Sequence, residues 1–111
     1  MTGADDRTDA LTVRGFQRLI EDLYGDRDGA RGVDGTFVWF VEEVGELARA
    51  LKGDDRENLE EEFADVFAWL ATLASLRGVD LAAAAGKYAR GCPGCGATPC
   101  TCPDKRSQRK S

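Results

Sequence analysis

The sequence has 111 residues, with 20 acidic and 15 basic side chains and a formal net charge of −5. A chain of this length forms one modest hydrophobic core. It contains no histidine, which excludes Ser-His-Asp and Cys-His catalysis, His-ligated zinc and phosphotransfer through histidine. No apolar run reaches the roughly 20 residues of a membrane span, and residues 1–11 are too polar for a signal peptide. We therefore expect a cytoplasmic protein without a membrane partner.

The charge is divided unevenly along the chain. From residue 86 onward, six basic residues and one acidic residue give a net charge of +5, so the preceding part carries −10. Binding to duplex nucleic acid depends on positive charge that meets the phosphates. The acidic body therefore argues against a nucleic-acid partner, while the basic tail either contacts a polyanion or is simply solvated.

Two helices with a loop between them are predicted in the first half of the chain. Residues 1–11 are polar and lack periodicity, which is typical of a loose arm. Thr12 is a suitable N-cap for a helix that ends near Tyr24. The glycine-rich, charged segment 25–35 predicts a loop, which either closes over a substrate or only connects helices. Thr36 then caps a second helix that ends at Lys52, followed by Gly53 as a C′ glycine.

Two further helices are predicted in the second half. One begins at Asp54 or Asp55 and ends at Arg77, where Gly78 stops it. A shorter helix covers residues 81–90 and ends at Gly91. No segment shows the sustained alternation of a strand, so the sequence predicts an all-α fold.

Two pairs of acids stand out on the second and third predicted helices. Glu43 and Glu46 are three residues apart, as are Glu62 and Asp65, so each pair lies on one face of its helix. Glu62 borders the apolar face, where a carboxylate is costly without a partner. Either pair alone is most simply ordinary solvated charge. Both pairs on adjacent helices favour a site for a hard cation, Mg²⁺ or Mn²⁺.

These residues resemble a known family. The stretches Glu43-Val-Gly-Glu46-Leu-Ala and Glu62-Phe-Ala-Asp65-Val, followed by Gly78-Val-Asp80-Leu81, are similar to the MazG-like nucleotide pyrophosphohydrolases. The signature of that family is an E-x-x-E followed by an E-x-x-D, and here 15 residues separate the two motifs. The resemblance covers residues 12–90. Phosphoribosyl-ATP pyrophosphatases share the fold and the acid pairs, but residues 42–50 are more similar to MazG.

The resemblance implies a four-helix bundle, completed by dimerisation or a larger homo-oligomer, that hydrolyses nucleoside triphosphates to the monophosphate and pyrophosphate. House-cleaning of dNTPs or modified nucleotides is the implied role. Glu43, Glu46, Glu62 and Asp65 would hold Mg²⁺ and orient a water toward the α-phosphorus, with Glu43, Glu46 or Glu61 as the general base. Basic residues of the fourth helix, Lys87 and Arg90, would contact the phosphates, although the asparagine that usually accompanies this lysine is not evident.

Two tryptophans lie beside the acids on the predicted helices. Trp39 shares a stripe with Glu43 and Glu46, and Trp69 flanks Glu62. Each either stacks on the nucleobase of the substrate or serves as an aromatic of the core or the dimer interface.

Four cysteines fall within eleven residues, with the spacing C-x2-C-x4-C-x-C: Cys92, Cys95, Cys100 and Cys102. This spacing predicts a knuckle that holds one structural Zn²⁺, since four thiolates leave no open position for catalysis. Reduced or redox-active thiols are the alternative. We therefore predict a MazG-like domain at 1–91 and a zinc knuckle with a basic tail at 92–111. The competing function is a non-catalytic zinc protein that binds nucleic acid or a protein partner through the knuckle and tail.

Overall fold

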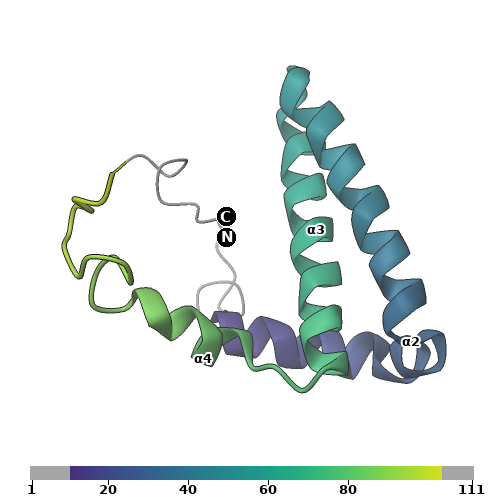
Figure 1. The fold of residues 1–111 in the computed structure, drawn as a ribbon. Helices are drawn as coiled ribbons and strands as arrows, with labels where there is room; N and C mark the ends of the chain where they lie inside the picture. Colours follow the sequence, from purple (N-terminus) through teal and green to yellow (C-terminus); the bar gives the residue numbers. More distant parts are fainter. Residues whose placement is uncertain (1–10, 104–111) are drawn as a thin grey trace, which may run out of the picture. The chain divides into compact units, whose positions relative to one another are not determined.

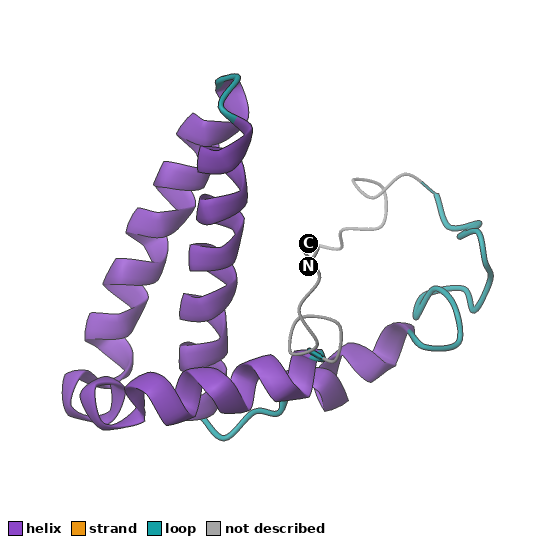
Figure 2. Cartoon of the chain, turned by 180° about the vertical axis from the view of Figure 1, so that it is seen from behind, coloured by secondary structure: helices purple, strands orange, loops and turns teal. Residues whose placement is uncertain are grey.

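A computed structural model describes residues 11–103, so the predicted N-terminal arm and most of the basic tail lie outside the described residues. Every regular element in this part of the chain is helical (Figure 2), which confirms the predicted all-α fold. The chain divides into two compact units, Met1–Leu81 and Ala82–Ser111. The predicted domain boundary at residue 91 stays a prediction.

Helix α2, Val13–Lys52, is much longer than predicted. It begins as expected, because the Thr12 hydroxyl accepts a hydrogen bond of 2.9 Å from the Gly15 N–H. The predicted loop 25–35 was wrong: the helix continues through it, and only Gly32 leaves the helical conformation, at φ 82° and ψ 176°. Glycine adopts this φ without steric cost. The segment is therefore a kink that joins two halves of α2 (Figure 1).

Two predicted caps of the second helix were also wrong. Thr36 is not an N-cap but a fully buried residue inside α2, and its hydroxyl accepts a hydrogen bond of 3.1 Å from Arg31 Nη1. Gly53 is the C-cap residue itself, in an extended conformation with φ −99° and ψ −175°. The glycine therefore ends α2 without the left-handed turn that a C′ glycine provides.

Helix α3, Arg56–Leu76, follows the prediction closely. The Asp55 carboxylate caps its first turn by accepting a bond of 3.1 Å from the Asn58 N–H. At its end Gly78 has φ +71°. The Gly78 N–H bonds to Ser75 O at 3.1 Å and the Val79 N–H bonds to Ala74 O at 2.8 Å. These two bonds are a Schellman motif, which explains why the helix stops there.

The second half of α2 and all of α3 lie side by side, and the first half of α2 crosses near the C-terminal end of α3 (Figures 1 and 2). Phe16 stacks on Phe67 with ring centroids 4.6 Å apart. Buried Gln17 donates to Ser75 Oγ at 3.0 Å and to Val79 O at 2.8 Å. Among the described residues, the buried hydrophobic side chains are few: Ile20, Ala50, Ala71 and Ala74. The core of this unit is therefore small.

The predicted helix 81–90 was too long. Helix α4 covers Leu81–Ala85, and a 3₁₀ turn, η1, covers Gly86–Tyr88. The α-helical geometry ends at Ala85, before Gly86, and glycine lowers helix propensity by about 1 kcal/mol.

No single described helix is long and apolar enough to cross a membrane. The two segments Arg56–Leu76 and Leu81–Tyr88, which are bent relative to one another, reach the required length and apolar composition only when they are taken together.

Candidate functional site

Three carboxylates from two helices converge in the first unit. Glu43 comes from α2, and Glu62 and Asp65 come from one face of α3. One carboxylate oxygen of each lies within 4.8 Å of the others. The structure therefore brings together three of the four acids that the sequence singled out.

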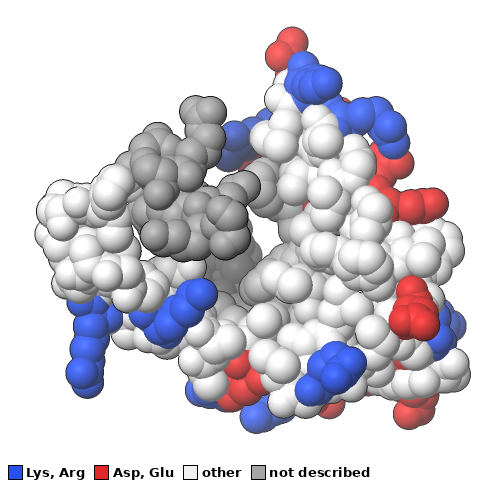
Figure 3. All heavy atoms as spheres, viewed as in Figure 1, with Lys and Arg blue, Asp and Glu red and all other residues white. Residues whose placement is uncertain are grey.

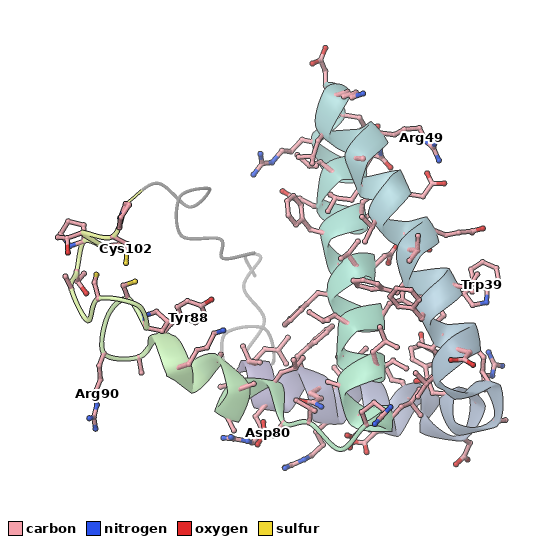
Figure 4. All side chains as sticks on the ribbon, in the orientation of Figure 1. Trp39, Arg49, Asp80, Tyr88, Arg90 and Cys102 are labelled. Carbon is pink, nitrogen blue, oxygen red and sulfur yellow. The ribbon has the colours of Figure 1, made fainter. Side chains whose placement is uncertain are left out.

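The fourth acid, Glu46, lies outside this group of three. It is exposed and forms an ion pair of 2.8 Å with Arg49, near the end of α2 (Figure 4). Exposed ion pairs contribute little, typically about 0.2–1 kcal/mol, so this contact does not lock the side chain. Participation of Glu46 in metal binding stays a prediction.

The three acids repel one another where they stand. Partial burial raises the pKa of Glu43 above its usual value, and the negative charges of Asp65, Glu62 and Glu46 raise it further. Glu62 Oε1 is buried and has no hydrogen-bond partner among the described residues. A buried polar atom without a partner costs about 1–3 kcal/mol. A positively charged partner for the three acids would remove this cost.

The donor set fits a hard divalent cation. Mg²⁺ and Mn²⁺ prefer carboxylate oxygens. A cation among Glu43, Glu62 and Asp65 would satisfy the orphaned Glu62 oxygen and remove the repulsion at Glu43. The three acids are therefore a candidate metal centre.

A cavity of about 270 Å³ adjoins this centre, because Asp65 lines both. Its other walls come from the first half of α2 and from α3: Ile20, Tyr24, Arg27, Asp28, Arg31, Ala68, Trp69 and Thr72. Asp28 is 6% exposed, and it accepts hydrogen bonds of 3.0 Å from Arg31 Nη1 and from the Thr72 hydroxyl. A cavity of mixed walls beside a metal centre is the usual form of a small-molecule site.

Comparison with known protein families identifies the family of the chain. The model of the MazG nucleotide pyrophosphohydrolase domain matches residues 32–94, more than half of the sequence. The chain belongs to the MazG family. No curated protein matches the sequence.

The MazG match begins at the kink of α2 and includes the three converging acids. The general function of this domain is hydrolysis of nucleotide pyrophosphates, with dependence on a metal. The matched residues exclude the first half of α2, which supplies Arg31 and Asp28 to the cavity. The sequence does not single out these two residues, because the charges of a predicted loop carry no periodic signal.

The two tryptophans lie together. Trp39 and Trp69 stack with ring centroids 6.3 Å apart and an angle of 18° between their planes. Trp69 lines the cavity, whereas Trp39, labelled in Figure 4, is not among its lining residues and is 48% exposed. Trp69 is therefore positioned to contact a nucleotide bound in this cavity, and a substrate contact from Trp39 stays a prediction.

Lys87 and Arg90 belong to the second unit. Lys87 Nζ lies 5.1 Å from the centre of the Tyr88 ring, a cation–π contact within the same turn. Arg90 lies in the turn that follows η1, not on a helix (Figure 4). Their predicted contacts with phosphate stay predictions.

The four cysteines of the second unit form a compact cluster. They carry no disulfide, and all four sulfurs lie within 4.8 Å of one another. The Sγ atoms of Cys92 and Cys102 are 3.7 Å apart, and those of Cys95 and Cys100 are 3.9 Å apart. A tetrahedral Zn²⁺ with Zn–S bonds of 2.3 Å separates its sulfurs by about 3.8 Å. The cluster thus has the dimensions of a four-thiolate metal site.

Local backbone bonds support this arrangement. The N–H groups of Gly94, Thr101 and Cys102 donate bonds of 3.3 Å to the sulfurs of Cys92, Cys95 and Cys100. Gly91 has φ +114°, and a Cβ there would lie 2.8 Å from Gly96 O, so the turn requires glycine.

The thiols differ in acidity. Hydrogen bonds from Thr101, and then from the Ala97 N–H, lower the pKa of Cys95 to about 5. Hydrogen bonding with Cys100, Cys95 and Cys92 raises the pKa of Cys102 to about 12. Four thiolates therefore do not form together at neutral pH without a cation that displaces the remaining protons.

Proposed function

We propose that this MazG protein is a Mg²⁺-dependent nucleoside triphosphate pyrophosphohydrolase. The observation that carries the proposal is the convergence of Glu43, Glu62 and Asp65, with the buried Glu62 Oε1 lacking any partner among residues 11–103. Mg²⁺, or Mn²⁺ in its place, would neutralise phosphate charge and lower the pKa of a bound water.

The reaction is hydrolysis at the α-phosphorus. The oxygen of a water molecule forms a bond to this phosphorus, and the bond from the phosphorus to the bridging oxygen breaks. Pyrophosphate leaves with the electron pair, and the proton of the water passes to a carboxylate. Glu43, Glu46 and Glu61 are the candidates for that base. Trp69 stands beside the cavity that adjoins Asp65, in a position to contact the nucleoside.

A homodimer or larger homo-oligomer is part of the proposal. Large apolar side chains on α2 and α3 are exposed in the single chain, among them Phe37, Val38, Val41, Leu51 and Phe63. The face shown in Figure 3 has a broad area of uncharged surface on the helical unit, with charged atoms gathered at its ends and edge. Burial of apolar area at about 25 cal/mol per Å² favours a second copy on such surfaces. Light scattering of the purified protein tests this.

We also propose that the four cysteines hold one structural Zn²⁺, and that Lys87 and Arg90 contact phosphate. The separations of 3.7 and 3.9 Å between sulfurs support zinc. The support for phosphate contacts by Lys87 and Arg90 is the positive charge of their side chains, since a triphosphate needs positive partners beyond the metal. A cytoplasmic location stays a prediction.

Product analysis in isotopically labelled water tests the reaction. The protein is incubated with canonical and modified (d)NTPs in H₂¹⁸O, with Mg²⁺ or with EDTA. The proposal predicts Mg²⁺-dependent release of pyrophosphate, with ¹⁸O in the nucleoside monophosphate. Label in pyrophosphate, or release of nucleoside diphosphate, would contradict attack at the α-phosphorus.

A second candidate is binding of single-stranded nucleic acid by the second unit. Residues 82–103 contain Lys87 and Arg90 but no acidic residue, and Tyr88 is 61% exposed. Exposed aromatic rings beside cations bind single strands by stacking and charge. A labelled oligonucleotide that binds at low salt and is released when residues 104–111 are deleted would favour this function. Turnover that survives the deletion favours the enzyme.

A further inference from the structure

The cavity beside Asp65 has walls of two kinds. Ile20, Tyr24, Ala68 and Trp69 supply apolar and aromatic surface, and Arg31, Asp28 and Thr72 supply a polar corner. Its volume of about 270 Å³ suits a flat heterocycle better than an extended chain of phosphates. Apolar walls with a few fixed polar groups are typical of a pocket that recognises one part of a ligand by shape and hydrogen bonds.

Arg31 is held in one position at the polar corner. Its Nη1 donates to Asp28 Oδ1 at 3.0 Å and to Thr36 Oγ1 at 3.1 Å. Its Cζ lies 4.9 Å from the centre of the Trp69 ring. Gly35 makes room for the side chain, since a Cβ at Gly35 would lie 2.8 Å from Arg31 Cγ. The kink at Gly32 and the glycine at position 35 therefore together fix this guanidinium before any ligand binds.

The Nε and Nη2 atoms of the Arg31 guanidinium are available to donate hydrogen bonds to a ligand. Arginine has five N–H donors, and among the described residues only those on Nη1 of Arg31 have hydrogen-bond acceptors. Within residues 11–103, no group accepts a hydrogen bond from Arg31 Nε or Nη2. Asp28 offsets the positive charge, and the Thr72 hydroxyl holds the second oxygen of that carboxylate at 3.0 Å. The corner therefore offers directed donors with little net charge, which suits a neutral carbonyl oxygen better than a phosphate.

We propose that this cavity takes the nucleobase of the substrate and that Arg31 donates a hydrogen bond to a carbonyl oxygen of the base. The proposal rests on the proposed nucleotide hydrolysis. Uracil, thymine, cytosine and guanine each carry a carbonyl oxygen, whereas adenine carries none. Adenine accepts only through its ring nitrogens, and it carries an amino group where guanine carries the O6 carbonyl. The N–H groups of that amino group would face the N–H donors of Arg31 in a partly closed site. The cavity therefore selects against adenine nucleotides.

The test compares kcat/KM for dATP with that for dGTP, dCTP, dTTP and dUTP. A hydrogen bond from a charged donor contributes about 1.5–3 kcal/mol, so we expect dATP to be worse than the best substrate by roughly tenfold or more. The double variant Asp28→Asn/Arg31→Met removes donor and counter-charge together, so no buried carboxylate loses its partner. Gly35→Ala displaces the Arg31 side chain without removing it. Both should bring dATP close to the other substrates.

Arg18→Met is the control, because Arg18 is exposed on the same half of α2 and does not line the cavity. It should keep the discrimination against dATP. Equal hydrolysis of dATP by the unaltered protein, or discrimination unchanged in both cavity variants, would overturn the proposal.

Binding measurements separate this proposal from the proposed function. Calorimetry with free deoxyuridine, deoxyguanosine and deoxyadenosine needs no turnover, and it should show weaker binding of deoxyadenosine. Selective binding of the nucleosides without any hydrolysis would contradict the proposed enzyme function and would support the assignment of the cavity to the base. Binding of tripolyphosphate that is lost in the double variant, with no nucleoside binding, would assign Arg31 to phosphate and contradict the assignment to the base.

Discussion

The two metal-capable clusters of this protein are built in opposite ways. Glu43 lies 19 residues before Glu62, and these acids meet only because α2 packs against α3. The four cysteines lie within eleven residues and are placed by the turns of their own segment. The acid centre is therefore a property of helix packing, whereas the cysteine cluster is a property of local sequence.

The clusters also differ in how they stabilise negative charge. Three backbone N–H groups donate to the sulfurs of the cysteine cluster. In the acid centre, the buried Glu62 Oε1 has no such donor among the described residues, and burial and neighbouring acids raise the pKa of Glu43. The cysteine cluster is thus prepared locally for a metal, while the acid centre carries a cost that a bound cation would remove.

The largest expected effect is on the cysteine cluster, where Cys95→Ser should abolish stoichiometric zinc. Structural zinc contributes about 10–16 kcal/mol to such small folds, so residues 82–103 should lose their ordered turns. The first unit should keep its helical content and unfolding midpoint, because its hydrogen bonds lie within itself. Zinc analysis and circular dichroism check this, and Ser107→Ala serves as a control outside the cluster. Unfolding of the whole protein in this variant would contradict the claim that the cysteine cluster is built locally and independently of the helix packing.

Next in size is the loss of turnover in Glu62→Gln. The amide removes a charge from the metal centre, so kcat/KM should fall by about 100-fold or more. The fold should persist, since the substitution also removes repulsion from Glu43. Steady-state kinetics and thermal melts measure both. Glu57→Gln, an exposed acid at the start of α3, should leave the rate unchanged, and an equal loss there would show that the effect is not specific.

A smaller effect is expected at the kink that positions the first half of α2. Gly32→Ala places a Cβ at φ 82° and ψ 176°, a conformation that is almost confined to glycine and costs an L-residue about 1–3 kcal/mol. Chemical denaturation should show that loss of stability. Gly29→Ala, inside the helix with open space around its Cβ, should be neutral or stabilising. If Gly32→Ala were equally harmless, the kink would not depend on glycine.

The smallest effect is the dependence of stability on pH in the metal-free protein. Because the folded state raises the pKa of Glu43, the folded protein binds more protons than the unfolded chain in the window just above the ordinary glutamate pKa. The free energy of unfolding should therefore fall as pH rises through that window. Mg²⁺ added to the metal-free protein, or Glu43→Gln, should flatten this slope and raise the Tm at neutral pH. Melts across pH check it, and an unchanged slope in Glu43→Gln would show that another group causes it.

Much of the fold followed from the sequence. Apolar periodicity and cap residues predicted α3 well, since Asp55 and Gly78 act locally at its ends. The helical course of residues 25–31 did not follow, because tertiary contacts of Asp28 and Arg31 override the local preference of the glycines for a loop.

The residues of the candidate site were likewise predicted only in part from the sequence. Regular spacing predicted Glu43, Glu62 and Asp65, since residues three apart share a helical face. It did not predict that Arg49 would engage Glu46, or that Arg31 and Asp28 would line the cavity. Those placements depend on side-chain partners and on the kink at Gly32, which no periodic pattern records.

Titration of the zinc-loaded protein with Mn²⁺, followed by electron paramagnetic resonance, tests most directly whether the three acids hold a divalent cation. The account predicts a saturable site that weakens by at least about tenfold in Glu43→Gln and in Glu62→Gln. Glu42→Gln, the exposed neighbour of Glu43 on α2, should bind Mn²⁺ as the unaltered protein does. Equal Mn²⁺ affinity in all four proteins would contradict a metal centre at these acids.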